Sequence, residues 1–139
     1  MTAGYSGTPL PKKLGIKEGH RLALLSAPEE FERALGELPP VTIAKSLSGK
    51  AAFDVIVLFT KSRTDLAKRF AATAKRLDHS GGFWVAWPKK SSKVQTDLTE
   101  DVVRDIALEV GLVDNKVCAI DETWSGLRCV YRVKDRPKK

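Results

Sequence analysis

The chain has 139 residues, the usual size of one domain and enough to bury one core. Hydrophobic residues make up 42% and charged residues 29%, which are values of folded globular proteins and exclude a disordered chain. No stretch approaches the roughly 20 apolar residues that span a bilayer, and no signal-peptide pattern is present, so we expect a cytoplasmic protein. The 24 Lys plus Arg against 17 Asp plus Glu give a formal charge of +7, which favours an anionic partner.

Both ends of the chain have compositions typical of irregular segments. Residues 1–13 mix Gly, Ser, Thr and Pro, which predicts an irregular leader. Residues 134–139 carry basic side chains and nothing apolar to anchor them, which predicts a solvated basic tail. We therefore expect a single domain over 1–139 whose regular elements lie between these two segments.

From Arg21 onward, short apolar runs alternate with amphipathic segments, a pattern typical of βα units and a largely parallel sheet. A buried strand over Arg21–Ser26 leads into a helix that opens at residues 27–30, runs to about Leu38 and stops at the following prolines. The next predicted elements are a short strand over Val41–Lys45, a central strand over Phe53–Thr60 and an amphipathic helix over Arg63–Leu77.

Glycine and proline mark the element boundaries of the second half. The pair Gly81–Gly82 predicts a turn into a strand over Phe83–Trp87, which ends at Pro88 before a lysine-rich loop. A helix follows over Thr96–Val110, with Thr96 or Asp97 as its N-cap and Gly111 as its stop. Two last strands, Lys116–Ile120 and Leu127–Val133, predict a closing hairpin. The alternation of strands and helices indicates the α/β class.

Several strings resemble Rossmann-like methyltransferases: LGIKEGHR at 14–21, FDVIV at 53–57 and GGFW at 81–84. The resemblance implies a three-layer, methyltransferase-like fold with a mostly parallel sheet of about six strands, closed by an antiparallel hairpin. Longer strings are similar to a family of short bacterial proteins catalogued as a domain of unknown function: WPKK at 87–90, DLTED at 97–101 and GLVDNKVCAIDETWSGLR at 111–128. This second likeness covers nearly the whole chain, and that family supplies no accepted activity.

The methyltransferase resemblance implies S-adenosylmethionine as a possible cofactor, but the turn that would approach it departs from the family pattern. That turn is Ser26-Ala-Pro-Glu-Glu30, where the family places glycines that permit close approach. The glycine-rich motif is therefore absent, and the same turn argues against a dinucleotide. One βα unit between Val41 and Phe53 is also missing. We therefore expect that the chain is not an enzyme. If it does catalyse a reaction, we expect that reaction to be methyl transfer.

The leading candidate site is a basic rim at the carboxyl ends of two predicted strands, where open α/β sheets bind ligands. Lys61 and Arg63 follow one strand, and Trp87, Lys89 and Lys90 end the next. The cations suit a phosphate or a carboxylate, and Trp87 could stack on a base. The alternative is a solvated basic loop with Trp87 packed on the core.

The predicted hairpin turn is a second candidate, because it gathers Asp121, Glu122, Trp124 and Arg128. These residues form a binding surface, or a carboxylate pairs with Arg128 across the hairpin while Trp124 covers a sheet edge. No metal site is expected. The remaining chemically notable residues are interpreted as polar surface histidines, His20 and His79, and reduced structural thiols, Cys118 and Cys129.

Three functions remain open. The leading hypothesis is a non-catalytic or degenerate Rossmann-like module that binds an anionic ligand at the basic rim. The second is a divergent S-adenosylmethionine-dependent methyltransferase. The third is a nucleic-acid-associated or protein-interaction module, which the positive charge favours although no nucleic-acid-binding motif is visible.

Overall fold

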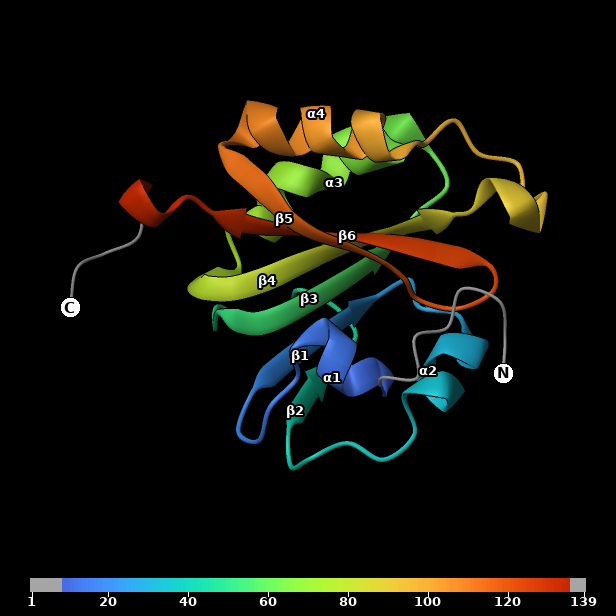
Figure 1. Ribbon diagram of the computed structural model, residues 1–139. Coiled ribbons are helices and arrows are strands. Elements are labelled where there is room, and N and C mark those ends of the chain that lie inside the picture. The colour runs from blue at the N-terminus through green and yellow to red at the C-terminus, as the bar shows by residue number, and fades with distance from the viewer. Residues whose placement is uncertain (1–8, 136–139) are drawn as a thin grey trace.

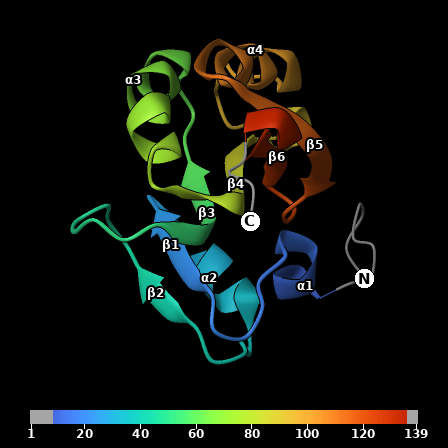
Figure 2. The ribbon, with the colours of Figure 1, turned by 90° about the vertical axis from the view of Figure 1, so that its left-hand side faces the viewer.

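The computed structural model describes residues 9–135 and arranges them in three layers. Helices α3 and α4 cover one face of a sheet, and α1 and α2 cover the other (Figures 1 and 2). The elements are α1 (Leu10–Leu14), β1 (Arg21–Leu25), α2 (Glu29–Leu35), β2 (Thr42–Ala44), β3 (Phe53–Phe59), α3 (Arg63–Ala74), β4 (Leu77–Pro88), the 3-10 turn η1 (Lys90–Ser92), α4 (Glu100–Val110), β5 (Leu112–Ala119), β6 (Trp124–Tyr131) and the 3-10 turn η2 (Val133–Asp135).

The six strands lie in the order β2-β1-β3-β4-β6-β5. The first four are parallel, and β6 runs antiparallel to both β4 and β5. This mostly parallel sheet closed by an antiparallel hairpin confirms the predicted fold class. The chain leaves β1 toward one side of the sheet and leaves β3 toward the other, so the strand order reverses between these two strands. Such a switch point is where open α/β sheets usually bind ligands.

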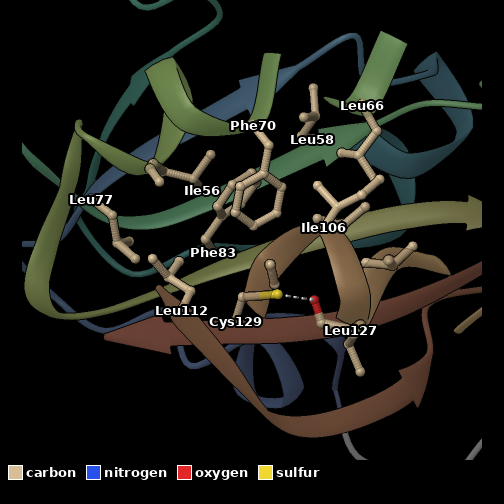
Figure 3. Close-up of a cluster of buried hydrophobic side chains, with 14 of the residues drawn as sticks. Ile56, Leu58, Leu66, Phe70, Leu77, Phe83, Ile106, Leu112, Leu127 and Cys129 are labelled. Carbon is tan, nitrogen blue, oxygen red and sulfur yellow. Dashed lines mark hydrogen bonds between the residues drawn. The ribbon is translucent and has the colours of Figure 1, made fainter. Parts of the chain in front are cut away.

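Residues 55–59 of the central strand β3 are all apolar, because they contribute to two cores. Ile56 and Leu58 are fully buried under α3 and α4, where they join Phe70 and Phe83 (Figure 3). The residues that alternate with them, Val55 and Val57, are buried on the side of α1 and α2. Each such side chain stabilises the fold by about 1.5–3 kcal/mol when removed from water. The continuous apolar run therefore identified the middle of the sheet correctly.

Residues 10–13 of the predicted irregular leader form helix α1 instead, together with Leu14. Leu10 and Leu14 lie one turn apart and are both buried, and Gly15 ends the helix at φ 80°. The indole Nε1 of Trp84 donates to the Leu14 carbonyl oxygen over 3.1 Å, which fastens α1 to the sheet. Burial of these side chains against the rest of the fold, rather than intrinsic helix propensity, therefore stabilises this short helix. The rest of the predicted leader, residues 1–8, lies outside the described residues, as do residues 136–139 of the predicted tail.

The predicted turn at Gly81–Gly82 is wrong, because both glycines belong to the long strand β4. Phe53 pairs with Leu77 but Val55 pairs with Gly82, so residues 78–81 bulge out of the ladder. A Cβ on Gly81 would lie 2.5 Å from the carbonyl oxygen of Asp54. The glycine is thus required by a close approach of two strands, not by a reversal of the chain.

Other boundaries differ by a few residues. Helix α2 ends at Leu35 rather than Leu38, since Gly36 takes φ 64°. Helix α3 ends at Ala74, so Leu77 begins a strand. The β5–β6 hairpin is longer than predicted and pairs Leu112 with Tyr131 at its open end.

The connection 45–52 between β2 and β3 contains no helix or strand, which agrees with the predicted loss of a βα unit. The Arg76 guanidinium holds this loop by donating to the carbonyl oxygens of Leu47, Ser48 and Ala51. Within residues 9–135, no helix has the length and apolar character needed to cross a membrane.

Candidate ligand-binding site

Two basic loops meet beyond the carboxyl ends of β3 and β4. The Thr96 hydroxyl donates to the Lys61 carbonyl oxygen over 2.5 Å, and the Arg63 amide donates to the Asp97 carboxylate over 2.7 Å. The loop before α4 is therefore fastened to the loop before α3. Residues 61–63 of the predicted rim thus lie beside residues 96–97, at the far end of the lysine-rich loop that follows β4.

A pocket of about 500 Å³ opens at the end of β4, beside the start of α4. Two of the predicted site residues, Trp87 and Lys90, line it. Sequence reasoning did not single out the other lining residues, although several belong to the predicted lysine-rich loop. They are Pro88, Lys93, Val94, Gln95, Thr96, Leu98, Thr99 and Glu100.

The pocket joins an apolar wall to two cations. Trp87 and Leu98 belong to the buried core and supply apolar surface, while Lys90 and Lys93 are exposed. The one carboxylate in the lining, that of Glu100, is ion-paired with Arg104 at 2.5 Å. The pocket lining therefore carries two lysine ammonium groups and one carboxylate that already has a partner.

The backbone that presents the two lysines is tightly shaped. Lys90 begins the 3-10 turn η1, and Lys93 ends it in the left-handed region, at φ 62°. The Lys93 amide donates to the Lys90 carbonyl oxygen over 3.2 Å, and the Ser92 hydroxyl donates to the Lys89 carbonyl oxygen over 2.6 Å. Non-glycine residues rarely adopt this conformation, and such strain gathers at binding sites.

The remaining residues of the predicted rim lie outside the pocket lining. Lys61 and Arg63 stand beside it, but the Arg63 amide at the start of α3 already binds the Asp97 carboxylate. The Lys89 amide donates to the Thr123 carbonyl oxygen over 2.7 Å, which ties this residue to the hairpin turn. Trp87 is only 6% exposed, so its ring is a wall of the pocket rather than an open stacking surface.

The four residues of the second predicted site do not form one surface. Asp121 accepts hydrogen bonds from the amides of Thr123 and Trp124, both over 2.8 Å, so its carboxylate holds the turn. Trp124 packs edge-on against Phe59, with ring centroids 5.0 Å apart, while Glu122 is exposed. Arg128 lies four residues further along β6, about 13 Å away at the usual strand rise, and lines a different pocket. The carboxylate of Asp121 therefore caps a turn instead of pairing with Arg128.

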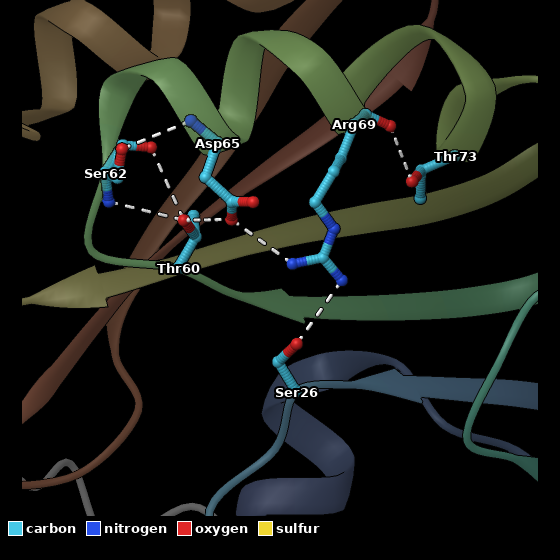
Figure 4. A network of polar contacts seen from close by, with 6 residues as sticks. All are labelled: Ser26, Thr60, Ser62, Asp65, Arg69 and Thr73. Carbon is cyan, nitrogen blue, oxygen red and sulfur yellow. Dashed lines mark hydrogen bonds and ion pairs between the residues drawn. The ribbon is translucent and has the colours of Figure 1, made fainter.

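A polar network crosses the switch point between β1 and β3 (Figure 4). The Arg69 guanidinium reaches from α3 to the Ser26 hydroxyl over 3.3 Å and to the Asp65 carboxylate over 3.2 Å. The Thr60 hydroxyl donates to the same carboxylate over 2.8 Å. The chain thus places its own side chains across the crevice where this fold usually binds ligands.

The residues around this crevice do not fit S-adenosylmethionine in the position usual for methyltransferases. Ser26 takes the left-handed conformation, at φ 59°, but carries a side chain that binds Arg69. Pro28 precedes the seven-residue helix α2 and offers no amide proton, and Glu29 and Glu30 lie in its first turn. Neither an open backbone turn nor a positive helix end is available to the methionine part of the cofactor.

A hollow of about 410 Å³ lies beside the crevice, and its charged lining residues are all basic. A nucleoside site of this fold class would instead need an acidic residue to bind the ribose. Lys45 follows β2, about 20 residues after β1, where dinucleotide-binding folds place an acidic residue for the ribose. Lys45 is instead ion-paired with Glu32 at 2.5 Å. Lys68 and Arg69 from α3 add further positive charge to the same hollow.

The cysteines and histidines lie outside the pocket at the end of β4. Burial raises the pKa of the Cys129 thiol to about 12, and burial also raises the pKa of the half-buried Cys118 despite the opposing charge of Lys13. His20 accepts a hydrogen bond from the Lys17 amide, and His79 lies against the ring of Tyr131. In the part of the chain that the structure describes, no three His, Cys, Asp or Glu residues gather as a metal site would require.

The fold is that of the S-adenosylmethionine-dependent methyltransferases. A provisionally assigned type 11 methyltransferase from Sulfolobus solfataricus matches with a TM-score of 0.65 and 12% identity, over 93% of each chain. Magnesium protoporphyrin IX methyltransferase from Synechocystis with bound SAM matches with a TM-score of 0.58 and 11% identity, over 88% of this chain and 74% of that one. A SAM-dependent methyltransferase from Aquifex aeolicus matches with a TM-score of 0.57 and 15% identity, over 85% of each chain.

Residues 13–133 match the family described as "Protein of unknown function (DUF3052)", and the chain belongs to this family. No curated protein matches the chain. The family and the fold were both anticipated from the sequence. At these low identities the solved structures define the fold alone.

Proposed function

We propose that this chain is a ligand-binding module without methyltransferase activity, and that it holds an anionic molecule with an apolar body in the pocket at the end of β4. The observation that carries the proposal is the position of Lys90 and Lys93 at the mouth of a pocket walled by Trp87 and Leu98. The pocket volume of about 500 Å³ falls in the range of small-molecule sites.

The ligand class follows from the lining. When an apolar or aromatic group leaves water and packs against Trp87, Val94 and Leu98, the free energy of the complex falls. A phosphate or carboxylate head group is attracted to Lys90 and Lys93, while the hydroxyl of Thr96 and the amide of Gln95 supply directional hydrogen bonds. A bare inorganic anion uses only half of this lining.

Isothermal titration with phenyl phosphate, benzoate and inorganic phosphate tests the proposal. Phenyl phosphate is expected to bind about tenfold or more tightly than inorganic phosphate, because only the former also buries a ring. The double variant Lys90→Gln, Lys93→Gln is expected to weaken phenyl phosphate binding about tenfold. Equal binding of phenyl phosphate and inorganic phosphate would contradict the assignment of an apolar wall.

A matched control replaces two exposed lysines elsewhere, Lys50→Gln and Lys75→Gln. This double variant loses the same net charge and is expected to bind as the parent chain does. If both double variants weakened binding equally, the attraction would come from the overall charge and the pocket assignment would fail. Comparing the two at low and high salt separates local from global attraction.

A divergent methyltransferase is the second candidate, favoured by the fold similarity to an enzyme with bound SAM. Its cofactor would need a binding mode that avoids the Ser26–Arg69 contact across the switch point. Titration with S-adenosylmethionine and its demethylated product discriminates the two candidates. Binding of either, competed by neither phenyl phosphate nor benzoate, would support the methyltransferase candidate.

A further inference from the structure

A third pocket, of about 310 Å³ and lined mostly by polar residues, opens at the opposite end of the sheet from the candidate site. Four segments of the chain that are distant in sequence line it: the α1–β1 loop, the start of β3, the bulged part of β4 and the middle of β6. The lining residues are Gly15, Lys17, His20, Asp54, Val55, Ser80, Gly81 and Arg128. The proposed function does not use any of them.

The glycine pair Gly81–Gly82 of β4 lets neighbouring groups approach the backbone closely at this pocket. The Arg128 guanidinium lies against the Gly82 backbone so closely that a Cβ there would overlap its Nε and lie 2.7 Å from its Cζ. Gly81 lets the Asp54 backbone approach in the same way. The bulge over residues 78–81 brings Ser80 to the pocket wall. Bulges of this kind re-aim side chains and recur beside functional sites.

The polar groups in the lining are held in defined orientations. Asp54 accepts a hydrogen bond from the Arg21 amide at one carboxylate oxygen, Oδ2, over 2.8 Å. His20 accepts from the Lys17 amide at Nδ1 over 3.1 Å, so its other ring nitrogen, Nε2, carries the proton of the neutral ring. The Ser80 hydroxyl donates to Asp78 over 2.5 Å, which leaves its oxygen as an acceptor.

We propose that this pocket binds a small zwitterion of the amino-acid class, with its carboxylate toward Arg128 and Lys17 and its ammonium toward Asp54. The pocket contains both signs of charge, so a simple anion would be repelled by Asp54 and a simple cation by Arg128. A zwitterion places an opposite charge beside each of these two side chains. The His20 Nε2–H is a further donor for the carboxylate, and the Ser80 oxygen is an acceptor for the ammonium.

The test is to titrate small charged compounds into the ¹⁵N-labelled chain and to follow the chemical shifts of its backbone amides by NMR. The zwitterions glycine, β-alanine and 4-aminobutyrate differ in the separation of their charges, while propionate and propylammonium carry one charge each. One zwitterion is expected to shift the amides of residues 15–20, 54–55 and 80–82 and to bind about tenfold more tightly than either single-charge compound. Equal affinity for propionate, or no shift of these amides with any of the three zwitterions, would overturn the proposal.

The variant Gly82→Ala tests the geometry without removing a charge. Its new Cβ displaces only the end of the flexible Arg128 side chain, so the chain is expected to fold and to bind the zwitterion about tenfold more weakly. Arg128→Gln is expected to have the same effect, and exposed Arg33→Gln is the matched control with no effect. Unchanged binding in both folded pocket variants would exclude Arg128 from the site. Phenyl phosphate binding at the other end of the sheet is expected to be unaffected, which separates this inference from the proposed function.

Discussion

The carboxylate of Asp97 accepts a hydrogen bond from the backbone amide of Arg63, with 2.7 Å between the two atoms. The contact joins residues 34 positions apart and places a negative charge at the amino terminus of α3, where the helix dipole favours it. The Arg63 amide at this helix start is therefore bound by a carboxylate of the chain itself.

Replacing this carboxylate is expected to destabilise the fold modestly. Asp97→Ala removes a partner of a helix-start amide, and we expect the free energy of unfolding to fall by about 1 kcal/mol. Urea denaturation measures the change. Exposed Asp105→Ala on α4 is the control, since it removes the same charge without an inter-loop contact. A loss for Asp97→Ala no larger than for the control would mean that the contact contributes nothing to stability.

The buried thiol of Cys129 predicts a loss of stability at alkaline pH. Burial, aided by the charge of Asp114, raises the pKa of this thiol from 9.0 to about 12. The unfolded chain therefore releases the proton at lower pH than the folded chain. The stabilisation is complete below pH 9 and is lost as pH rises toward about 12, by at most about 1.4 kcal/mol per pH unit.

The variant Cys129→Ala isolates this effect. At neutral pH we expect it to be less stable by about 1 kcal/mol, because a small cavity replaces the sulfur. Above pH 9 its stability should decline less steeply than that of the parent chain, as followed by urea denaturation across the window. Burial also raises the pKa values of Cys118 and Tyr131, but both residues remain in the variant and cancel in the comparison. Parallel pH profiles for the two chains would contradict the assignment.

The fold was predictable where local pattern and burial agree. Residues 55–59 are apolar on both faces, and the structure buries both. The misassigned elements depend on contacts that no local pattern contains. Helix α1 exists because Leu10 and Leu14 are covered by the sheet, and Gly81 is glycine because Asp54 approaches it.

The candidate site was predictable as two basic loops but not as a pocket. Thr96 and Asp97 were interpreted as helix caps, whereas Thr99 caps α4 by accepting from the Val102 amide. Thr96 and Asp97 instead fasten the two loops together. Which lysines line the pocket depends on η1 and the left-handed Lys93, and a sequence of lysines and serines does not specify that turn.

Trp84 is expected to be a principal stabilising residue of the face that α1 covers. Its ring is fully buried, and its Nε1 donates to the Leu14 carbonyl oxygen. Trp84→Phe leaves a cavity and removes the donor from a buried carbonyl, so we expect a loss of about 2–4 kcal/mol. The control Trp124→Phe changes a half-buried ring at the hairpin and should cost less. Urea denaturation measures the free energy of unfolding of both variants. Equal losses would mean that the fold is sensitive to the loss of any indole ring and not to the Trp84–Leu14 contact.

The strained Lys93 allows stability and ligand binding to be changed in opposite directions. Its φ of 62° is unfavourable for a residue with a side chain, so Lys93→Gly is expected to raise the free energy of unfolding by about 0.5–1 kcal/mol. The same change removes one of the two pocket lysines and should weaken phenyl phosphate binding. The matched control is Lys75→Gly, at a helical φ of −63°, which should lower stability and leave binding unchanged. Calorimetry gives both quantities for each variant. If Lys93→Gly were stabilising but bound phenyl phosphate as tightly as the parent chain, Lys93 would be strained without contributing to the proposed site.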